Sequence, residues 1–391
     1  MNKPGLAMIA NVPTPYRTAL HIRIAREIVE FELHSLFTHA SADFNWNDPM
    51  PAEIRPVSFC GEAERVGGNP LRSLSRDYRK ARKIAAYLKE HNVQVVVLMG
   101  YHDLTRLWLS RYCRRQRIKL FLRGDSNIKG DNPGSPSRAA LKFRLLSWFI
   151  RQCDGVMPMG GYGQQYFEKY GADPEKIFWV PYEPDYAQFA RVDPEHLAAF
   201  RLENGVSQTR RYLLYCGRLV RAKRVDLLID AFKRIASDRP EWDLLIAGDG
   251  VLCGELQRLV PPELADRVRW LGFCDVCRIR LAYHAADVLV LPSDFEPWAV
   301  VVNEAMAAGL VVVASDVVGA AAELVRDGES GRLFEAGDIE ALTAAIADVT
   351  DPDRLQGLKQ AVPSALAAWR NRADPIEGIR KALRSVGMLS N

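Results

Sequence analysis

The clearest pattern in the chain is an alternation of short apolar runs and amphipathic segments over residues 212–314. The apolar runs have the length of strands, and the segments between them repeat apolar residues every three or four positions. The predicted strands are Tyr212–Leu219, Trp242–Ala247, Val268–Phe273, Asp287–Pro292 and Leu310–Ala314, and the predicted helices are Val225–Ser237, Glu255–Val260, Val276–Ala285 and Asn303–Ala308. Continuous apolar strands between helices are typical of a parallel sheet covered on both faces. This half is therefore predicted to be a doubly wound α/β domain.

The first half of the chain repeats this pattern less regularly. The predicted strands here are Leu6–Ala10, Phe31–Phe37, Val93–Met99, Ile118–Leu122 and Ile177–Val180. The irregular segment after the last of them contains Pro181 and Pro184 and is a plausible hinge. We therefore predict two Rossmann-like domains that face each other across a cleft, over residues 1–182 and 183–365. A helical segment over 366–391 could pack back on the first domain.

Length and composition agree with two globular domains. The 391 residues are 48% hydrophobic and 26% charged, and no apolar run reaches the roughly 18 residues that a membrane span needs. Residues 1–10 lack the features of a signal peptide, so we expect a cytoplasmic protein. Seven scattered cysteines favour reduced thiols. Cys274 and Cys277 form a C-x-x-C without a second pair, so we interpret them as packing residues at a helix start and predict no metal site.

Charge is distributed unevenly along the chain. Residues 1–180 hold 27 Lys and Arg against 17 Asp and Glu, whereas residues 181–391 hold 25 against 31, which together give the net charge of +4. The basic residues gather in Arg72–Lys83 and Arg106–Lys119. They could form solvated helix faces, or they could attract an anionic membrane surface or an anionic acceptor. Nucleic acid is not expected as a partner, because no aromatic platform or binding motif accompanies the charge.

The segment Pro136–Arg151 raises the same question of a membrane. It is predicted to be a helix with an apolar face formed by Leu141, Leu145, Trp148 and Phe149. Basic side chains flank this face: Arg138, Lys142 and Arg144. We favour an ordinary amphipathic helix, and a helix that rests on a membrane is the alternative.

Two acidic side chains suggest a chemical role for the second domain. Glu296 follows a predicted buried strand, and Glu304 lies near the start of the next helix. The first N–H groups of a helix have no partner within it, so they can bind a pyrophosphate. Both carboxylates could then accept hydrogen bonds from sugar hydroxyls. In the alternative interpretation, the negative charge of Glu304 only interacts favourably with the helix dipole, and Glu296 is a solvated surface residue.

A basic turn lies at the end of another strand of the same domain. Gly217 and Arg218 follow the first predicted strand, and Lys223 precedes the next helix. A guanidinium and an ammonium at one turn suit a diphosphate leaving group. Surface charge on a loop is the alternative. Because the carboxyl ends of parallel strands share one edge, we expect this turn and the two glutamates to lie close together.

The residues of this half resemble a known family. Gly217-Arg218 with Lys223, Leu271-Gly272-Phe273, Asp287–Ser293, Glu296 with Glu304–Gly309, and Asp327-Gly328 with Gly331–Phe334 look like the donor domain of family-4 (group 1) glycosyltransferases. The resemblance is strong over about residues 175–345 and weak before them. It implies the GT-B fold, in which the first domain binds the acceptor and the second binds a nucleotide sugar. It also implies retention of the anomeric configuration and no obligatory metal or other cofactor. The sequence does not fix the nucleotide base, and we favour UDP over GDP.

The resemblance carries roles to particular residues. It implies that Arg218 and Lys223 hold the diphosphate, that Glu304 binds the ribose hydroxyls, and that Glu296 contacts the donor sugar. The remaining donor-binding residues it implies are Gly217, Gly272, Phe273, Pro297, Trp298, Ala299 and Val300. Gly272 and Phe273 would lie against the base. Ala299 stands where the family usually has glycine.

The first domain supplies the other half of the predicted site. His102 follows the strand Val93–Met99 and would touch the reacting sugar, as the fourth catalytic residue beside Arg218, Lys223 and Glu296. The expected acceptor-side residues are Asn11, Pro15, Tyr16, Arg17, Arg123 and Asp125. The loop at residues 11–17 lacks the paired glycines of many relatives, and its prolines make it stiffer.

We therefore expect a retaining hexosyltransferase that moves a sugar from a nucleotide diphosphate to a hydroxyl of a glycan or lipid-linked acceptor in envelope polysaccharide or glycolipid synthesis. The expected mechanism is a front-side displacement in which the departing phosphate takes the acceptor's proton, and a double displacement through a carboxylate stays open. A sugar-nucleotide epimerase, a phosphorylase and a non-catalytic glycan-binding module are alternatives. A nicotinamide dehydrogenase is disfavoured, because no strand is followed by G-x-G-x-x-G.

Overall fold

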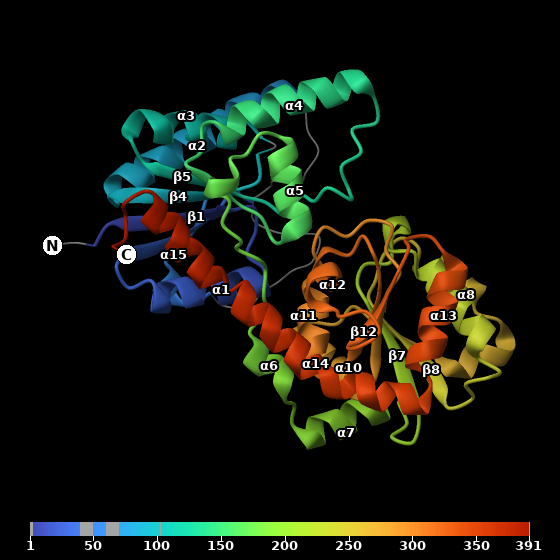
Figure 1. Cartoon of the computed structure of the whole chain (residues 1–391). Coiled ribbons are helices and arrows are strands. Elements are labelled where there is room, and N and C mark those ends of the chain that lie inside the picture. Colours follow the sequence, from blue (N-terminus) through green and yellow to red (C-terminus); the bar gives the residue numbers. More distant parts are fainter. Residues whose placement is uncertain (1–2, 40–49, 60–69, 102, 391) are drawn as a thin grey trace. The chain divides into compact units, whose positions relative to one another are not determined.

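The computed structural model describes residues 3–39, 50–59, 70–101 and 103–390, and the chain forms two compact units (Figure 1). The N-terminal unit consists of Met1–Tyr182 together with Ala373–Asn391, and the C-terminal unit consists of Glu183–Arg372. The first division coincides with the boundary expected after residue 182. The returning segment begins at Ala373, whereas the expected segment began at 366, because one long helix, α14 (Pro352–Arg372), belongs to the C-terminal unit up to its end.

The N-terminal unit contains a parallel six-stranded sheet in the order β3-β2-β1-β4-β5-β6. Its strands are β1 (Gly5–Ala10), β2 (Glu32–Phe37), β3 (Pro56–Ser58), β4 (Val93–Met99), β5 (Lys119–Arg123) and β6 (Gly155–Met157). β1 pairs with both β2 and β4, so the strand order reverses between β1 and β4. In open α/β sheets, ligands bind outside the carboxyl ends of the strands at this reversal.

Helices cover both faces of this sheet. The first face carries α2 (Pro70–Glu90), α3 (Leu104–Gln116) and α4 (Pro136–Ile150), which share one apolar cluster with Ala7 and Ile9 of β1. The opposite face carries α1 (Pro15–Glu27) and α15 (Pro375–Ser385), which share a second cluster with Leu6 and Met8. Because alternate residues of β1 enter the two clusters, this strand is apolar throughout, as the sequence pattern indicated. The remaining elements are α5 (Gly161–Lys169) and the short helices Ala52–Ile54 and Pro174–Lys176.

The predicted strand Ile177–Val180 is wrong. Only Ile177 forms a bridge, to Val156 of β6. Phe178 and Val180 still donate N–H bonds to the carbonyls of Val156 (2.9 Å) and Pro158 (3.0 Å). A parallel ladder also needs a return bond from residue 158, and proline has no N–H to make it.

The prediction for α4 needs a correction as well. Its buried face consists of Leu146, Phe149 and Ile150 with Ser147, whereas Leu141 is 58% exposed and Leu145 is 56% exposed. The two leucines were expected on the packed face. They lie on a different face because one helical face covers only about a third of the turn.

The C-terminal unit repeats the architecture with a sheet in the order β12-β11-β10-β7-β8-β9. Its strands are β7 (Arg211–Cys216), β8 (Trp242–Ala247), β9 (Val268–Gly272), β10 (Val288–Leu291), β11 (Val311–Ser315) and β12 (Gly331–Phe334). Its helices, besides α14, are α6 (Tyr186–Ala190), α7 (Pro194–Glu203), α8 (Val225–Ile235), α9 (Cys253–Leu259), α10 (Val276–Ala285), α11 (Val300–Ala307), α12 (Gly319–Leu324) and α13 (Ile339–Val349), and short helices cover Arg221–Lys223 and Pro262–Arg267. The doubly wound domain predicted for this half is confirmed.

Two details of this unit differ from prediction. α11 begins at Val300, three residues before the predicted start, because tertiary packing overrides the strand preference of three consecutive valines.

Cys277 is exposed at the start of α10, off the face that buries Ile279, Ala282 and Tyr283. Only Cys274, which is half-buried, can be a packing residue. All cysteines in the described residues are free thiols.

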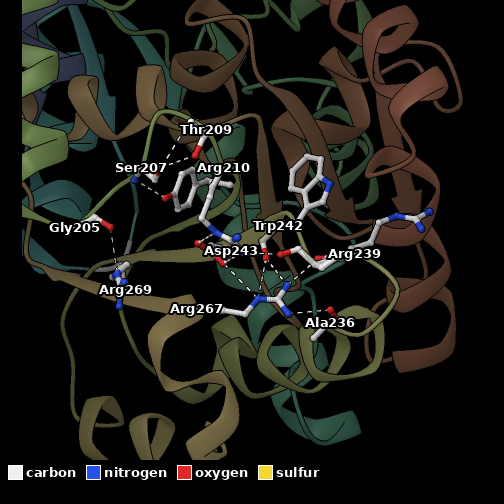
Figure 2. Close-up of polar contacts among 12 residues, drawn as sticks. Gly205, Ser207, Thr209, Arg210, Ala236, Arg239, Trp242, Asp243, Arg267 and Arg269 are labelled. Atoms are coloured by element: carbon white, nitrogen blue, oxygen red, sulfur yellow. Dashed lines mark hydrogen bonds and ion pairs between the residues drawn. The ribbon is translucent and has the colours of Figure 1, made fainter.

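A polar network fastens the amino-terminal edge of this second sheet (Figure 2). Asp243, near the start of β8, lies between two guanidinium groups: Arg210 donates to it at 2.6 Å, and Arg267 approaches at 3.4 Å. Arg267 also donates to the carbonyls of Ala236 and Arg239, both at 2.8 Å. This charge-assisted network stabilises the edge opposite to the one where ligands of such sheets bind.

Candidate functional site

The basic turn after β7 lies against the loop after β8 at the carboxyl edge of the second sheet. Gly217 has φ 155°, and the N–H of Gly217 bonds the carbonyl of Ala247 at 3.0 Å. A Cβ on Gly248 would lie 1.8 Å from the carbonyl oxygen of Gly217. Only glycine therefore allows these two loops to approach so closely.

Lys223 and Glu296 form an ion pair within the C-terminal unit. Their side chains are 16% and 18% exposed. The loops that carry them are also joined through the backbone, because the N–H of Asp294 bonds the carbonyl of Ala222 at 2.9 Å. The basic turn and the first glutamate, which lie 73 residues apart, therefore meet as the sequence pattern predicted. Arg218 is exposed beside them.

The loop between Glu296 and α11 is held by the start of α12. The carbonyl of Glu296 accepts from the N–H of Gly319 at 3.2 Å, and the carbonyl of Trp298 accepts from Ala320 at 2.7 Å. The indole of Trp298 is buried against Trp369, with ring centroids 5.5 Å apart. Of the predicted donor residues, Trp298 thus offers its backbone and not its ring. Pro297 and Val300 are half-buried.

Ala299 turns the chain into α11 with a left-handed backbone. Its φ is 74°, a conformation that costs an L-residue about 1–2 kcal/mol more than glycine. The resemblance had marked this position as one where glycine is usual. The turn leaves the first N–H groups of α11 at the carboxyl edge of the sheet, where they can bind an anion.

Glu304 lies one turn inside α11 and bonds a tyrosine that the sequence pattern did not reveal. The hydroxyl of Tyr283 donates to Glu304 Oε2 at 2.8 Å. Burial raises the pKa of Glu304 to about 7, and the tyrosine bond opposes that shift. Tyr283 lies on the apolar face of α10, where the sequence pattern predicts an ordinary core residue. The contact with Glu304 is therefore seen only in the structure.

Gly272 and Phe273 follow β9 at the same edge. Gly272 has φ 66°, and the ring of Phe273 is 44% exposed. The carbonyl of Gly272 accepts from the N–H of Gly248 at 2.8 Å, which links this loop to the one after β8. An exposed aromatic ring at a ligand edge suits stacking against a flat base.

In the N-terminal unit, a buried arginine joins two loops at the carboxyl edge of the first sheet. Arg106 is 2% exposed and pairs with Asp103, and its Nη2 donates to Asn11 Oδ1 at 2.5 Å. Its Nε donates to the carbonyl of Met99 at 2.5 Å. Asn11 follows β1 and Asp103 follows β4, so Arg106 couples the two loops at the reversal of strand order. The sequence pattern did not reveal this role of Arg106, and His102 lies outside the described residues.

The other acceptor-side residues gather around Tyr182. Arg123 is fully buried, donates to the carbonyls of Val180 (3.0 Å) and Pro181 (3.1 Å), and lies 4.5 Å from the centre of the Tyr182 ring. Burial lowers the pKa of Arg123 and raises that of Tyr182 to about 12. Arg17 donates to the carbonyl of Val12 at 2.9 Å and to the Tyr182 hydroxyl at 3.3 Å. Tyr16 packs edge-on against Tyr182, with ring centroids 4.7 Å apart.

Exposure separates the possible roles of these residues. Arg123 has no surface for a ligand and therefore positions Tyr182. Asp125 is exposed, and Pro15 is half-buried as the first residue of α1. Across the described ranges, no group of three or more His, Cys, Asp or Glu side chains could hold a metal ion. Over the same residues, no helix has the length and apolarity to cross a bilayer.

Comparison with known proteins places the chain in a family. Residues 210–351 match the family model described as glycosyl transferases group 1. The chain is 30% identical over 276 residues to the lipopolysaccharide core biosynthesis mannosyltransferase LpcC of Rhizobium leguminosarum, covering 65% of this chain and 74% of that protein. The chain therefore belongs to the group 1 glycosyl transferases, and the predicted class of protein is confirmed.

Other relatives are longer than the matched region. The chain is 32% identical over 223 residues to a D-inositol 3-phosphate glycosyltransferase of Geodermatophilus obscurus, a match that covers 54% of this chain and 49% of that protein. A match to an exopolysaccharide phosphotransferase of Streptomyces coelicolor has 36% identity over 151 residues, and covers 38% of this chain and 16% of that protein. The chain thus spans half or less of the length of these two relatives.

Solved structures support the fold. The structure of HepE from Anabaena, in complex with UDP and glucose, has a TM-score of 0.73 over 99% of this chain and 100% of that one, at 19% sequence identity. Two six-stranded parallel sheets with helices on their faces match this architecture. The predicted GT-B fold is therefore confirmed.

Proposed function

We propose that this chain is a retaining glycosyltransferase that moves a hexose-type sugar from a UDP-sugar to a hydroxyl of a glycan or lipid-linked acceptor. The observation that carries the proposal is the meeting of Lys223 and Glu296 beside the start of α11, at the ligand edge of the second sheet. The name of the Rhizobium relative, a mannosyltransferase of lipopolysaccharide core synthesis, supports a hexose and an envelope acceptor. UDP in the complex of HepE supports the nucleotide.

The proposed donor site divides the work among these residues. Arg218, Lys223 and the first N–H groups of α11 bind the diphosphate, whose negative charge grows as the glycosidic bond breaks. Glu304 accepts hydrogen bonds from the ribose. Glu296, released from full pairing with Lys223 when the ammonium turns to the phosphate, accepts from a hydroxyl of the sugar.

The proposed reaction is a front-side displacement. The bond between the anomeric carbon and the β-phosphate oxygen breaks, the acceptor oxygen attacks from the same side, and the departing phosphate takes the acceptor's proton. The protein stabilises the charge that develops on the leaving group and needs no nucleophile of its own.

A panel of nucleotide sugars tests the function. A donor stabilises the folded protein and raises its melting temperature, and transfer to an added acceptor gives net product. Product that keeps the donor's anomeric configuration supports the retaining mechanism, and an inverted product contradicts it. An epimerised donor would show that the chain is an epimerase, and release of sugar phosphate would show that it is a phosphorylase. Either result would contradict the proposed transfer.

The lysine that pairs with Glu296 offers the sharpest variant. Lys223→Ala should lower the rate of transfer about a hundredfold, because loss of one such contact costs on the order of 3 kcal/mol in the transition state. Lys233→Ala is the control: this lysine is 40% exposed on α8 and pairs with Asp230. Equal turnover in the two variants would contradict the donor site.

We also propose that the basic face of the N-terminal unit docks on an anionic membrane surface. The helices α2, α3 and α4 share this face, and neither α3 nor α4 contains an acidic residue. Leu141 and Leu145 are exposed on α4, with the exposed Arg138 and Arg144 beside them. Apolar side chains that are surrounded by basic side chains are suited to insertion between anionic lipid headgroups.

Flotation with vesicles that contain anionic lipid tests this docking. The double variant Leu141→Ser with Leu145→Ser should lose most binding, and high salt should weaken binding of the unchanged protein. Leu202→Ser is the control, because Leu202 is 85% exposed but lies in the C-terminal unit. Flotation that is equal in all three proteins, or absent at low salt, would contradict the proposal.

A further inference from the structure

The turn that opens α1 in the N-terminal unit contains buried polar atoms without a partner. Thr14 is the N-cap residue of α1, but its side chain caps nothing within the described residues, and its Oγ1 is buried and unpartnered there. Thr14 as a whole is only 7% exposed. The Nε of Arg17, one turn further, is also buried and unpartnered in that part of the chain. Buried polar atoms nearly always find a partner, so two orphans in one turn point to a ligand.

The charge around this turn is positive. Arg17 and Arg123 approach the same ring, with guanidinium carbons 5.7 and 4.5 Å from the centre of Tyr182. Neither forms an ion pair with a carboxylate of the described residues, and the exposed Asp125 acts on both only at a distance. The half-buried Arg17 and the fully buried Arg123 carry like charges that repel each other, and an anion beside them would relieve that repulsion.

The backbone adds to the attraction. α1 has 13 residues, with Pro15 at its first position and no acidic residue in its first turn. The first N–H groups of a helix have no acceptor within it and carry the positive end of the helix dipole. A hydroxyl, a guanidinium Nε and the first N–H groups of the helix thus belong to one turn at the carboxyl end of β1, and this set of donors suits the oxygens of a phosphate.

We propose that the start of α1 binds a phosphate group carried by the acceptor, with Thr14 and Arg17 as its ligands. Arg123 and Tyr182 hold Arg17 in place and do not touch the ligand. The inference rests on the proposed function, because it names the class of acceptor: a phosphorylated glycan, lipid or polyol. The donor's diphosphate has the same chemistry, but it already has Arg218, Lys223 and the start of α11 in the C-terminal unit.

The first arm of the test is thermal stability in inorganic phosphate. Phosphate should raise the melting temperature of the unchanged protein with the logarithm of its concentration above the dissociation constant, and Arg17→Gln should weaken phosphate binding about tenfold to a hundredfold, as expected for a hydrogen-bonded charge. Arg26→Gln is the control, because Arg26 lies on the same helix, is 67% exposed and pairs with Glu53. A shift that grows linearly with phosphate concentration, as general exclusion of the salt from the protein surface produces, or that is equal in the two variants, overturns the site.

Thr14→Val keeps the test independent of folding. The variant removes a buried unpaired hydroxyl, so the melting temperature without phosphate should stay equal or rise, while the phosphate-dependent increase shrinks. A melting temperature that falls without phosphate, together with an unchanged phosphate effect, would mean that Thr14 is structural and would overturn its role as a ligand.

The second arm separates the acceptor from the donor. The affinity of UDP for Arg17→Gln should equal that for the unchanged protein, while KM for a phosphorylated acceptor rises and KM for its dephosphorylated form does not. A loss of UDP affinity as large as the loss of phosphate affinity would assign this site to the donor and overturn the inference. Failure of the proposed function gives a different result, because then no nucleotide sugar stabilises either protein.

Discussion

At the scale of single residues, Glu304 makes the donor site sensitive to pH. Burial raises the pKa of its carboxyl group to about 7. Without ligand, protonation is therefore favoured in the folded state, and the contribution of this group to stability is full below about pH 4.5 and lost as pH rises through 7. A ribose hydroxyl that donates to Glu304 favours the ionised form and lowers the pKa again.

Binding of the UDP-sugar should consequently release about half a proton per molecule near pH 7, and its affinity should rise about fivefold to tenfold between pH 6 and pH 8. Calorimetry in buffers of different ionisation enthalpy measures the release. The pyrophosphate of a UDP-sugar has no group that titrates in this range, unlike the terminal phosphate of UDP. Glu304→Gln should remove the dependence on pH, and a dependence that persists in this variant would assign the titration elsewhere.

At this scale the sequence predicted residue types better than contacts. The cations at 218 and 223 and the glutamates at 296 and 304 follow strand ends, so their shared edge could be expected from the alternation of strands and helices. The bond between Tyr283 and Glu304 could not, because Tyr283 lies at a core position of an amphipathic helix. Periodicity reports which face a residue occupies, and it carries no information on which side chain it meets there.

At the scale of elements, Arg106 of α3 holds the loops after β1 and β4 together. Arg106→Gln should destabilise the N-terminal unit by about 1–3 kcal/mol, because it removes the guanidinium that donates to both the carboxylate of Asp103 and the amide oxygen of Asn11. Chemical unfolding followed by fluorescence measures the change. Arg115→Gln, an exposed position on the same helix, should change stability by less than about 0.5 kcal/mol. Equal stability of the two variants would show that the loops do not depend on Arg106.

The accuracy of the predicted elements follows from burial. β4 and β8 have the predicted bounds, because both faces of these strands are buried and the apolar run ends where the strand ends. β3 and β6 are only three residues long and contain Pro56 and Gly155, so no run marks them. The predicted start of α11 was three residues too late, because its valines favour strands in isolation. Their neighbours in the fold hold them in a helix.

At the scale of the whole molecule, the chain leaves the N-terminal unit after Tyr182 and returns to it at Ala373. α15 then fills part of the core beneath α1, where Ile379 is fully buried and Leu383 is 1% exposed. Arg23 of α1 also donates to Asp374, the N-cap residue of α15, at 2.8 Å. Residues that follow the C-terminal unit in sequence therefore support the fold of the N-terminal one.

Ile379→Ala should destabilise the N-terminal unit by about 2–5 kcal/mol, the usual cost of a large cavity in a core. Hydrogen exchange should increase in α1 and in β1, which share this cluster, and should stay unchanged in α13. Lys381→Ala, at an exposed position of the same helix, should leave both regions unchanged. Faster exchange confined to the C-terminal unit would contradict the assignment of α15.

The return of the chain at Ala373 also sets an order of events during synthesis on the ribosome. Domains generally fold as units, and the earlier one usually folds first. Here Glu183–Arg372 is continuous in sequence and can complete its core as soon as it has emerged. The unit that contains the first strand must wait for α15, which is made last of its elements. Its unfinished apolar surface under α1 is exposed in the meantime, and is a candidate for protection by a chaperone.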